Sequence, residues 1–242
     1  WKNVSDRVGF WADMDNPYVT YHNDYIESEW WALKQIWDKG LLYKGHKVVP
    51  YCPRCGTALS SHEVAQGYKD VKEESAIAKF KVADQENTYF LAWTTTPWTL
   101  PSNVILSVNA KETYAKAKYE DYYVIMAEAL MESVLGEGNY EVVERMKGGD
   151  LEYVKYEPLF DFQPNGEDFK GYFMTCDDYV TLTDGTGIVH TAYAYGEDDY
   201  RVCKKYGVTF YQNVNTDGHL NEIAGPFKGL FVKDADPVIL KY

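Results

Sequence analysis

The sequence has 242 residues, of which 45% are hydrophobic, enough for one large domain or a domain with an appendage. Its formal net charge of −13 argues against broad binding along a nucleic-acid backbone, which calls for lysine and arginine, but allows contact with a nucleic-acid end. No charged-then-apolar leader is visible, and no run approaches the ~18 apolar residues of a membrane span. Only two of the four cysteines form a motif, which does not suit a disulfide framework. We expect a soluble cytoplasmic piece of a longer chain, without a membrane partner.

Residues 1–74 are predicted to form a lead-in to the main domain. Within them, residues 24–40 carry apolar side chains at the four-three-four spacing of an amphipathic helix: Ile26, Trp30, Leu33 and Trp37. Asn23 or Asp24 can cap the start of this helix, and Gly40 stands where a left-handed residue ends it.

The lead-in also contains a turn with two cysteines, Cys52 and Cys55, at C-x-x-C spacing. Two thiols in such a turn suit half of a tetrahedral structural zinc site, which needs two further ligands. No second C-x-x-C is present, and Cys176 and Cys203 are isolated. A surface turn with reduced thiols and a redox pair are the alternatives, although Pro53 fits the start of a redox helix poorly.

Residues 75–242 are rich in short β-branched and aromatic runs. Strands are predicted at residues 76–82, 88–94, 104–108, 113–119, 122–127, 140–146, 151–157, 171–176, 185–192 and 229–234. Short helices are predicted at residues 127–136 and 196–207. Many strands and few helices predict a mixed α/β, mostly β domain that is barrel-like, with short peripheral helices.

Residues 93–103, WTTTPWTLPSN, place short hydroxyls and two prolines directly after a predicted strand. Taken alone, this stretch is a strand end shaped by proline. The alternative is that the hydroxyls and backbone N–H groups of Thr94, Thr95 and Thr96 form one wall of a reaction site.

Residues 185–200, GTGIVHTAYAYGEDDY, form a second dense segment. The carboxylates of Asp198 and Asp199 fall in the first turn of a predicted helix, where each would stabilise the helix dipole by ~0.3–1 kcal/mol. His190 by itself is equally explained as a buried core histidine. A histidine, a glycine turn and a carboxylate nine residues further on can, however, line one cavity together. Glycine-rich phosphate loops and the G-x-S-x-G elbow are missing from the sequence.

The two segments together resemble the editing domain of isoleucyl-tRNA synthetases, the large insertion in the catalytic fold of a class I synthetase. The resemblance covers the whole chain, and residues 11–64 are similar to the stretch where the insertion leaves the catalytic core. Valyl and leucyl relatives carry an arginine in the threonine motif, as T-T-R-P. Thr96 at that position, together with His190, favours the isoleucyl member.

The resemblance implies hydrolysis of the ester that joins valine to the 3′ end of isoleucine tRNA. A pocket distinguishes isoleucine from valine by only ~1–3 kcal/mol, so these enzymes, the standard example of double-sieve editing, use a second pocket to remove valine. The family is also credited with editing valyl-adenylate. No cofactor is implied for editing; ATP serves the parent's catalytic domain, whose H-I-G-H and K-M-S-K-S signatures are missing here. The implied partners are the 3′ end of tRNA(Ile) carrying valine and the remaining domains of the synthetase.

The resemblance also implies roles for the matched residues. The carboxylate of Asp199 anchors the substrate's α-ammonium, with Asp198 as its solvated neighbour, and Thr95 helps to place the hydrolytic water. The bulk of His190 excludes the extra methylene of isoleucine. The further implied substrate contacts are Thr94, Thr96, Asn103 and Trp98, the last as a face for the terminal adenosine or as a pocket wall.

Two departures from the family pattern stand out. The family reads H-x-A-P after the glycine pair, whereas here Tyr193 follows Ala192, which frees φ and restores a donor in the loop. The family's second cysteine pair lies beyond residue 242, so only half of a zinc site belongs to this sequence. Two other classes stay open: a non-catalytic β binding module, given 22 tyrosines and 7 tryptophans, and a zinc-dependent hydrolase.

Overall fold

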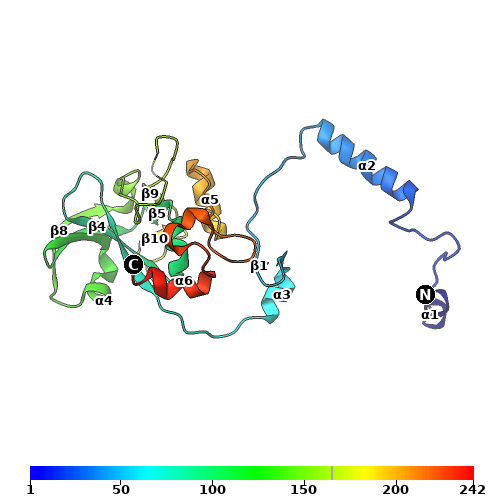
Figure 1. Ribbon diagram of the computed structural model, residues 1–242, viewed down its shortest axis with the longest axis horizontal. Coiled ribbons are helices and arrows are strands. Elements are labelled where there is room, and N and C mark those ends of the chain that lie inside the picture. Colours follow the sequence, from blue (N-terminus) through cyan, green and yellow to red (C-terminus); the bar gives the residue numbers. More distant parts are fainter. Residues whose placement is uncertain (165) are drawn as a thin grey trace. The chain divides into compact units, whose positions relative to one another are not determined.

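The structure is a computed structural model that describes residues 1–164 and 166–242 (Figure 1). Contacts divide the chain into two compact units, Trp1–Lys47 and Val48–Tyr242, which we describe separately. The boundary predicted between residues 74 and 75 stays a prediction. Among the described residues, no helix combines the length and apolar character that crossing a bilayer requires.

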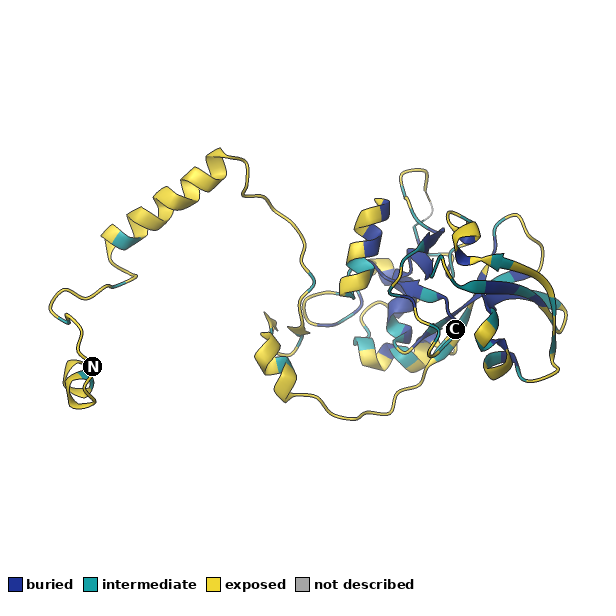
Figure 2. Ribbon diagram, turned by 180° about the vertical axis from the view of Figure 1, so that it is seen from behind, coloured by how far each residue is buried: buried dark blue, intermediate teal, exposed yellow. Residues whose placement is uncertain are grey.

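The first unit contains two helices, α1 (Lys2–Arg7) and α2 (Asn23–Asp38). The second of these confirms the helix predicted over residues 24–40, and Gly40 follows it with a left-handed φ of 68°. The predicted cap is wrong, because Asn23 and Asp24 lie inside the helix and its N-cap, His22, makes no side-chain capping bond. No residue of this unit is buried, as the yellow ribbon of Figure 2 shows, so the apolar face of α2 is exposed.

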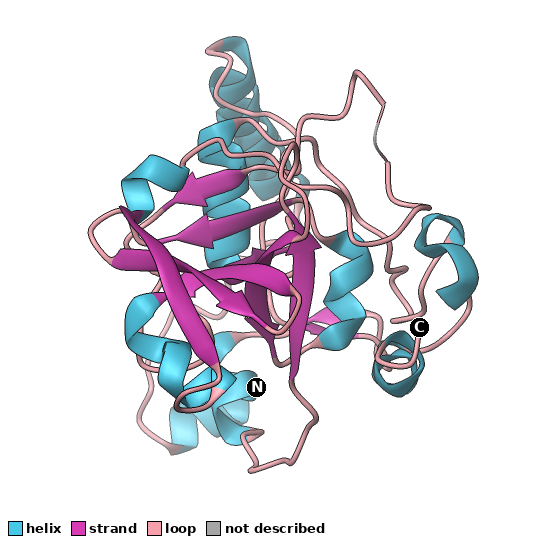
Figure 3. Cartoon of the chain, turned by 90° about the vertical axis from the view of Figure 1, so that its left-hand side faces the viewer, coloured by secondary structure: helices cyan, strands magenta, loops and turns pink. Residues whose placement is uncertain are grey.

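The second unit is built on one large mixed sheet with short helices around it (Figure 3). The strands of the large sheet are β3 (Ala76–Lys81), β4 (Thr88–Thr94), β5 (Ile105–Val108), β6 (Thr113–Tyr119), β7 (Tyr122–Ala127), β8 (Tyr140–Lys147), β9 (Met174–Cys176) and β10 (Val189–Thr191). Strands β1 (Tyr51–Cys52) and β2 (Thr57–Ala58) form a separate two-stranded sheet. The helices of this unit are α3 (Ser61–Gln66), α4 (Met131–Leu135), α5 (Glu197–Tyr206) and α6 (Val232–Ile239), with 3₁₀ turns η1 (Pro97–Ser102), η2 (Glu128–Leu130), η3 (Gly148–Leu151) and η4 (Glu222–Phe227).

Strand β4 organises the sheet because it has three partners but only two edges. The antiparallel strand β3 pairs with it from Tyr89 to Thr94. Strand β7 runs parallel to its first half, at Thr88 to Phe90, and β10 runs parallel to its end, at Trp93. Strands β7 and β10 therefore share one edge of β4, and the sheet diverges where β4 ends.

The core lies on both faces of this sheet. Along β4, Phe90 and Ala92 face the largest apolar cluster, whereas Leu91 faces a cluster capped by Met131 of α4. A third cluster forms where Val202 and its neighbours on α5 pack over β5. Figure 1 shows these two helices over different parts of the sheet, α4 near β8 and α5 near β5 and β9.

The predicted mixed α/β class is confirmed, but three expectations are wrong. Within the described residues, β8 and β9 are the two edge strands of the sheet and do not pair with each other, so the sheet does not close into a barrel. Residues 151–157 form no strand, because Tyr153 has a left-handed φ of 68° that turns the chain. Residues 229–234 contain the start of α6, in which Ala235 and Ile239 are buried at helical spacing.

Gly187 shows how tightly the turn before β10 packs against the end of β7. Its φ is 71°, and a Cβ there would lie 2.4 Å from the Cβ of Ala127 and 2.8 Å from the Cδ2 of Leu182. We predict that Gly187→Ala lowers the free energy of unfolding by about 2–5 kcal/mol, of which about 1–2 comes from the left-handed backbone and about 1–3 from overpacking. Urea unfolding measures this loss.

Gly138 provides the matched control for this substitution. Its φ is 75°, but a Cβ there would meet nothing within 4 Å, so Gly138→Ala should cost only the backbone part. Equal losses in the two variants would show that the contact between Gly187 and Ala127 is not tight.

Candidate functional site

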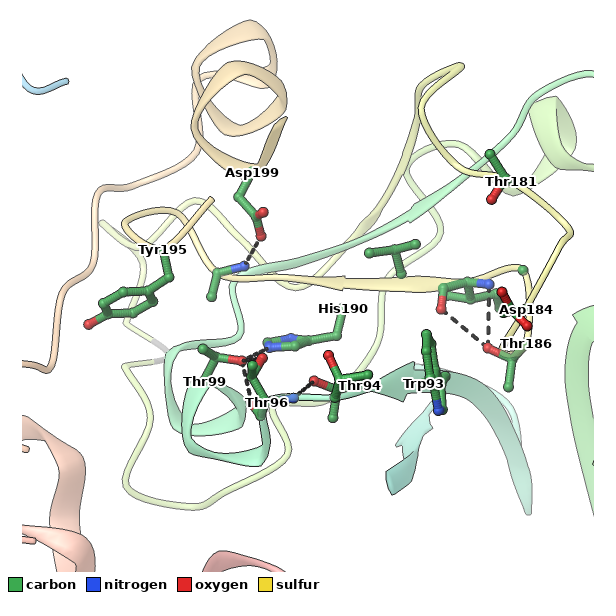
Figure 4. A pocket seen from close by; sticks show the side chains of 15 residues that line it. Trp93, Thr94, Thr96, Thr99, Thr181, Asp184, Thr186, His190, Tyr195 and Asp199 are labelled. Atoms are coloured by element: carbon green, nitrogen blue, oxygen red, sulfur yellow. Dashed lines mark hydrogen bonds between the residues drawn. The ribbon is translucent and has the colours of Figure 1, made fainter. Parts of the chain in front are cut away.

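A cavity of about 250 Å³ lies where β4 ends beside β10. Figure 4 shows Asp199 and Asp184 at opposite ends of this cavity, with His190 between them. The structure therefore brings the threonine segment and the glycine-rich segment together. The cavity is lined by Trp93, Thr94, Thr95, Thr96, Thr99, Thr181, Asp184, Thr186, Gly187, Ile188, Val189, His190, Ala192, Tyr195 and Asp199.

One wall of the cavity is the turn from β4 into η1. The Thr94 hydroxyl accepts a hydrogen bond from the backbone N–H of Thr96 at 3.1 Å, which bends the chain at the strand end. The Thr96 hydroxyl lies 3.3 Å from that of Thr99. Thr95 is exposed, and in the described part of the chain its hydroxyl has no hydrogen-bond partner. Thr95 is thus the member of this wall whose hydroxyl is unconstrained.

The opposite side is dominated by His190, which is buried and hydrogen-bonded through both ring nitrogens. Nδ2 of Asn103 donates to the carbonyl oxygen of Ile105 at 3.0 Å, which fixes the orientation of the amide. The same Nδ2 lies 2.9 Å from His190 Nδ1, so Nδ1 must accept. Nε2 therefore carries the proton and donates to the Thr99 hydroxyl at 2.9 Å, and that hydroxyl donates in turn to the carbonyl oxygen of Thr96 at 2.8 Å.

Burial lowers the pKa of His190 to about 4. The cause is desolvation of the charged imidazolium, and the neutral tautomer already satisfies both ring nitrogens. The ring is therefore uncharged at neutral pH, and it presents bulk to the cavity without repelling a cation.

Asp199 stands in the first turn of α5, where its carboxylate reaches back across the loop that follows β10. Its Oδ1 accepts a hydrogen bond from the backbone N–H of Ala192 at 2.7 Å. A Cβ at Gly196 would lie 2.1 Å from the other carboxylate oxygen, so only glycine allows this approach. Burial raises the pKa of Asp199 to about 6, against the lowering effect of the Ala192 hydrogen bond.

The neighbouring carboxylate has a different environment. Asp198 is exposed and accepts a hydrogen bond from Arg201 at 2.8 Å, while Arg201 also pairs with Asp177 through two nitrogens at 2.8 Å. Asp198 does not line the cavity. The expected division between a cavity carboxylate and a solvated neighbour matches these positions.

Two predicted contact residues lie behind the cavity wall and do not line it. Trp98 packs edge-on against Tyr195, with ring centroids 5.0 Å apart, and Tyr195 itself lines the cavity. Asn103 is fully buried, and its Oδ1 accepts a hydrogen bond from the Tyr156 hydroxyl at 2.6 Å. The geometry favours a positioning role for Asn103 behind His190; direct substrate contact by either residue stays a prediction.

Several lining residues were not among the predicted site residues. Thr99 stands three residues after Thr96, the spacing of one 3₁₀ turn, so its place in the wall could have been read from the motif. Thr181 and Asp184 lie just before the first glycine of the second segment, where only the polar composition marked them. Nothing in the local sequence distinguished Trp93 or Tyr195 from the many other aromatic residues.

The cysteine turn supplies two metal donors. Cys52 ends β1 and Cys55 lies in the turn between β1 and β2, where its backbone nitrogen lies 3.4 Å from the Cys52 sulfur. This backbone hydrogen bond is the main reason why the pKa of Cys52 is lowered. In the described residues, no three His, Cys, Asp or Glu side chains form a metal-binding group. The turn fits half of a zinc site, and the other two ligands would have to come from another chain segment.

Solved structures share the fold of the second unit. The structure described as GlLeuRS-CP1 matches 69% of this chain and 94% of its own, with a TM-score of 0.56 at 16% identity. The P. knowlesi cytosolic leucyl-tRNA synthetase editing domain matches 73% of this chain and 95% of its own, with a TM-score of 0.51 at 14% identity. At such low identity these matches establish the fold.

Relatives in sequence are considerably more similar. The isoleucine–tRNA ligases of Clostridium kluyveri and Clostridium acetobutylicum are 58% and 60% identical to the whole chain, which spans 23% of their length. The resemblance to isoleucyl enzymes is thereby confirmed. Residues 1–211 match the family model of the class I tRNA synthetases (I, L, M and V). The chain therefore belongs to the class I tRNA synthetases (I, L, M and V).

Proposed function

We propose that this chain is the editing part of an isoleucyl-tRNA synthetase and hydrolyses valine from tRNA(Ile). The observation that carries the proposal is that Thr95, His190 and Asp199, from two distant segments, line one cavity. The 58% identity to an isoleucine–tRNA ligase and the fold shared with leucyl editing domains support it. Because the chain spans 23% of such relatives, it works together with the remaining domains of the parent enzyme.

The carboxylate of Asp199 binds the α-ammonium of the valyl ester. It is the partly buried acid at one end of the cavity, and an ion pair there is stronger than one at the surface. Neutral His190 beside it lets the ammonium bind without repulsion. Its ring then limits the length of side chain that the cavity admits, so valine enters and isoleucine is rejected.

The threonine wall places the hydrolytic water. The unconstrained hydroxyl of Thr95 holds the water, with backbone N–H groups of the same turn available for the carbonyl oxygen as it gains charge. The water oxygen attacks the ester carbonyl carbon, the bond from that carbon to the ribose oxygen breaks, and the ribose oxygen takes up the proton that the water loses. Free valine and a tRNA with an intact 3′ ribose leave, without a covalent enzyme intermediate or a cofactor.

The net charge agrees with a substrate that presents only its end, and the state of the cysteines agrees with a reducing compartment. The chain carries a net charge of −13, so the body of the tRNA is held by the basic surfaces of other domains. All four cysteines are unpaired, which agrees with the reducing cytoplasm as the place of the reaction.

Asp199→Asn tests the anchor. In the intact synthetase, deacylation of Val-tRNA(Ile) should fall about 30-fold or more, because the ammonium loses a partly buried partner worth about 2 kcal/mol or more. Aminoacylation with isoleucine should stay within about twofold. Asp198→Asn is the matched control and should clear valine normally. Normal clearing of valine by the Asp199 variant would refute the anchor. If the wild type binds a valyl-adenosine analogue but does not deacylate Val-tRNA(Ile), the β binding module is favoured instead.

His190→Ala tests the size filter. Removing the ring should raise deacylation of the cognate Ile-tRNA(Ile) by about 5- to 150-fold, the equivalent of ~1–3 kcal/mol for one methylene. The measurement is release of labelled isoleucine, with His62→Ala on the exposed surface as control. If the variant still spares isoleucyl-tRNA, another residue sets the size limit.

The pH dependence tests the same carboxylate independently. Since the pKa of Asp199 is raised to about 6, the anchor is ionised above that pH and becomes neutral below it. We predict that kcat/KM for Val-tRNA(Ile) falls about tenfold for each pH unit below about 6. The Asp199→Asn enzyme should lack this acid limb, and its persistence would assign the limb to another group.

A further inference from the structure

The threonine wall is held from outside by a residue near the other end of the chain. The backbone N–H of Trp98 donates to Oδ1 of Asp236 at 2.7 Å. Trp98 is the second residue of η1, so its N–H is one of the donors that the start of a helix leaves without an internal partner. Asp236 supplies the missing acceptor across 138 positions of sequence.

Helix α6 holds Asp236 firmly in place. Ala235 and Ile239 of this helix are buried in the largest apolar cluster. The second carboxylate oxygen, Oδ2, lies 3.8 Å from Nζ of Lys233, which also binds Glu73 at 2.6 Å. Because α6 is anchored in the core, the acceptor that meets Trp98 has a fixed position.

The bonded amide lies close to the site in sequence and in space. Thr95 and Thr96 precede Trp98 by three and two residues, with the rigid Pro97 between them. On the other side, the Trp98 ring packs against Tyr195 of the cavity lining. A shift of η1 would therefore move the hydroxyls of the threonine wall relative to Asp199, which stands on a different element.

We propose that Asp236 is a positioning residue for the hydrolytic step, acting through the Trp98 amide on the threonine wall. The inference rests on the proposed function. Asp236 touches no substrate, and what it contributes is a fixed hydrogen-bond acceptor. An asparagine keeps an equivalent carbonyl oxygen at that position, whereas an alanine removes it.

The test compares Asp236→Ala with Asp236→Asn in the intact synthetase. Asp236→Ala should lower kcat for deacylation of Val-tRNA(Ile) at least tenfold and change KM less than threefold, because the Asp199 anchor is undisturbed. Asp236→Asn should stay within about threefold of the wild type. Asp234→Ala, an exposed acid on the same helix, is the matched control and should behave as the wild type. Unchanged activity in Asp236→Ala, or an equal loss in both Asp236 variants, would overturn the proposal.

A second measurement does not depend on activity. In amide hydrogen exchange followed by NMR on the 242-residue chain, Trp98 N–H should be protected in the wild type and in Asp236→Asn, and exchange at least tenfold faster in Asp236→Ala. Unchanged exchange in Asp236→Ala would overturn the proposal. If the wild-type synthetase fails to deacylate Val-tRNA(Ile), the proposed function fails, and the exchange data still decide whether Asp236 holds this turn.

Discussion

A buried hydrogen-bond chain with a single direction sets the chemistry of this cavity. It runs from the Tyr156 hydroxyl through the amide of Asn103 to the ring of His190, and then through Thr99 to the backbone of Thr96. The direction is fixed because the chain ends on a backbone carbonyl, which can only accept, and because the Asn103 amide also donates to Ile105. A protonated His190 would have to break its bond with Asn103. The same bonds thus keep the ring neutral and hold it against the threonine wall.

The cavity itself follows from the shared edge of β4. Since β7 and β10 divide that edge, no single strand runs along it to the end of β4, and the chain turns there into η1. The turn exposes Thr95 on one side, and β10 brings His190 to the other. The loop after β10 then leads into α5, whose first turn carries Asp199. Thr95, His190 and Asp199 thus reach the cavity from three parts of the chain, which meet where β4 ends beside β10.

Much of the fold, and several of the residues that line the candidate cavity, could be predicted from the sequence, because they depend on local patterns. Short runs of β-branched and aromatic residues predicted most strands, and the two dense segments supplied the threonines, His190 and Asp199. The failures involve information that is not local. The left-handed φ of Tyr153 has no sequence mark, since such a φ is expected of glycine or asparagine. The bond from Trp98 to Asp236 joins residues 138 positions apart, and the role of Asn103 depends on partners from β10 and from the loop that holds Tyr156.

The replacement of the family's proline by Tyr193 shows how packing can take over a task of backbone rigidity. A proline would limit φ in the loop between His190 and Asp199. Tyr193 is instead buried in the cluster under α5, where its ring lies 5.5 Å from Tyr200 and 5.1 Å from Phe210. Tyr200 directly follows Asp199 on the helix, so the loop is fixed to the element that carries Asp199. The position of the carboxylate then depends on an aromatic contact, which constrains the loop from its far side, together with the hydrogen bond from the Ala192 N–H to Asp199.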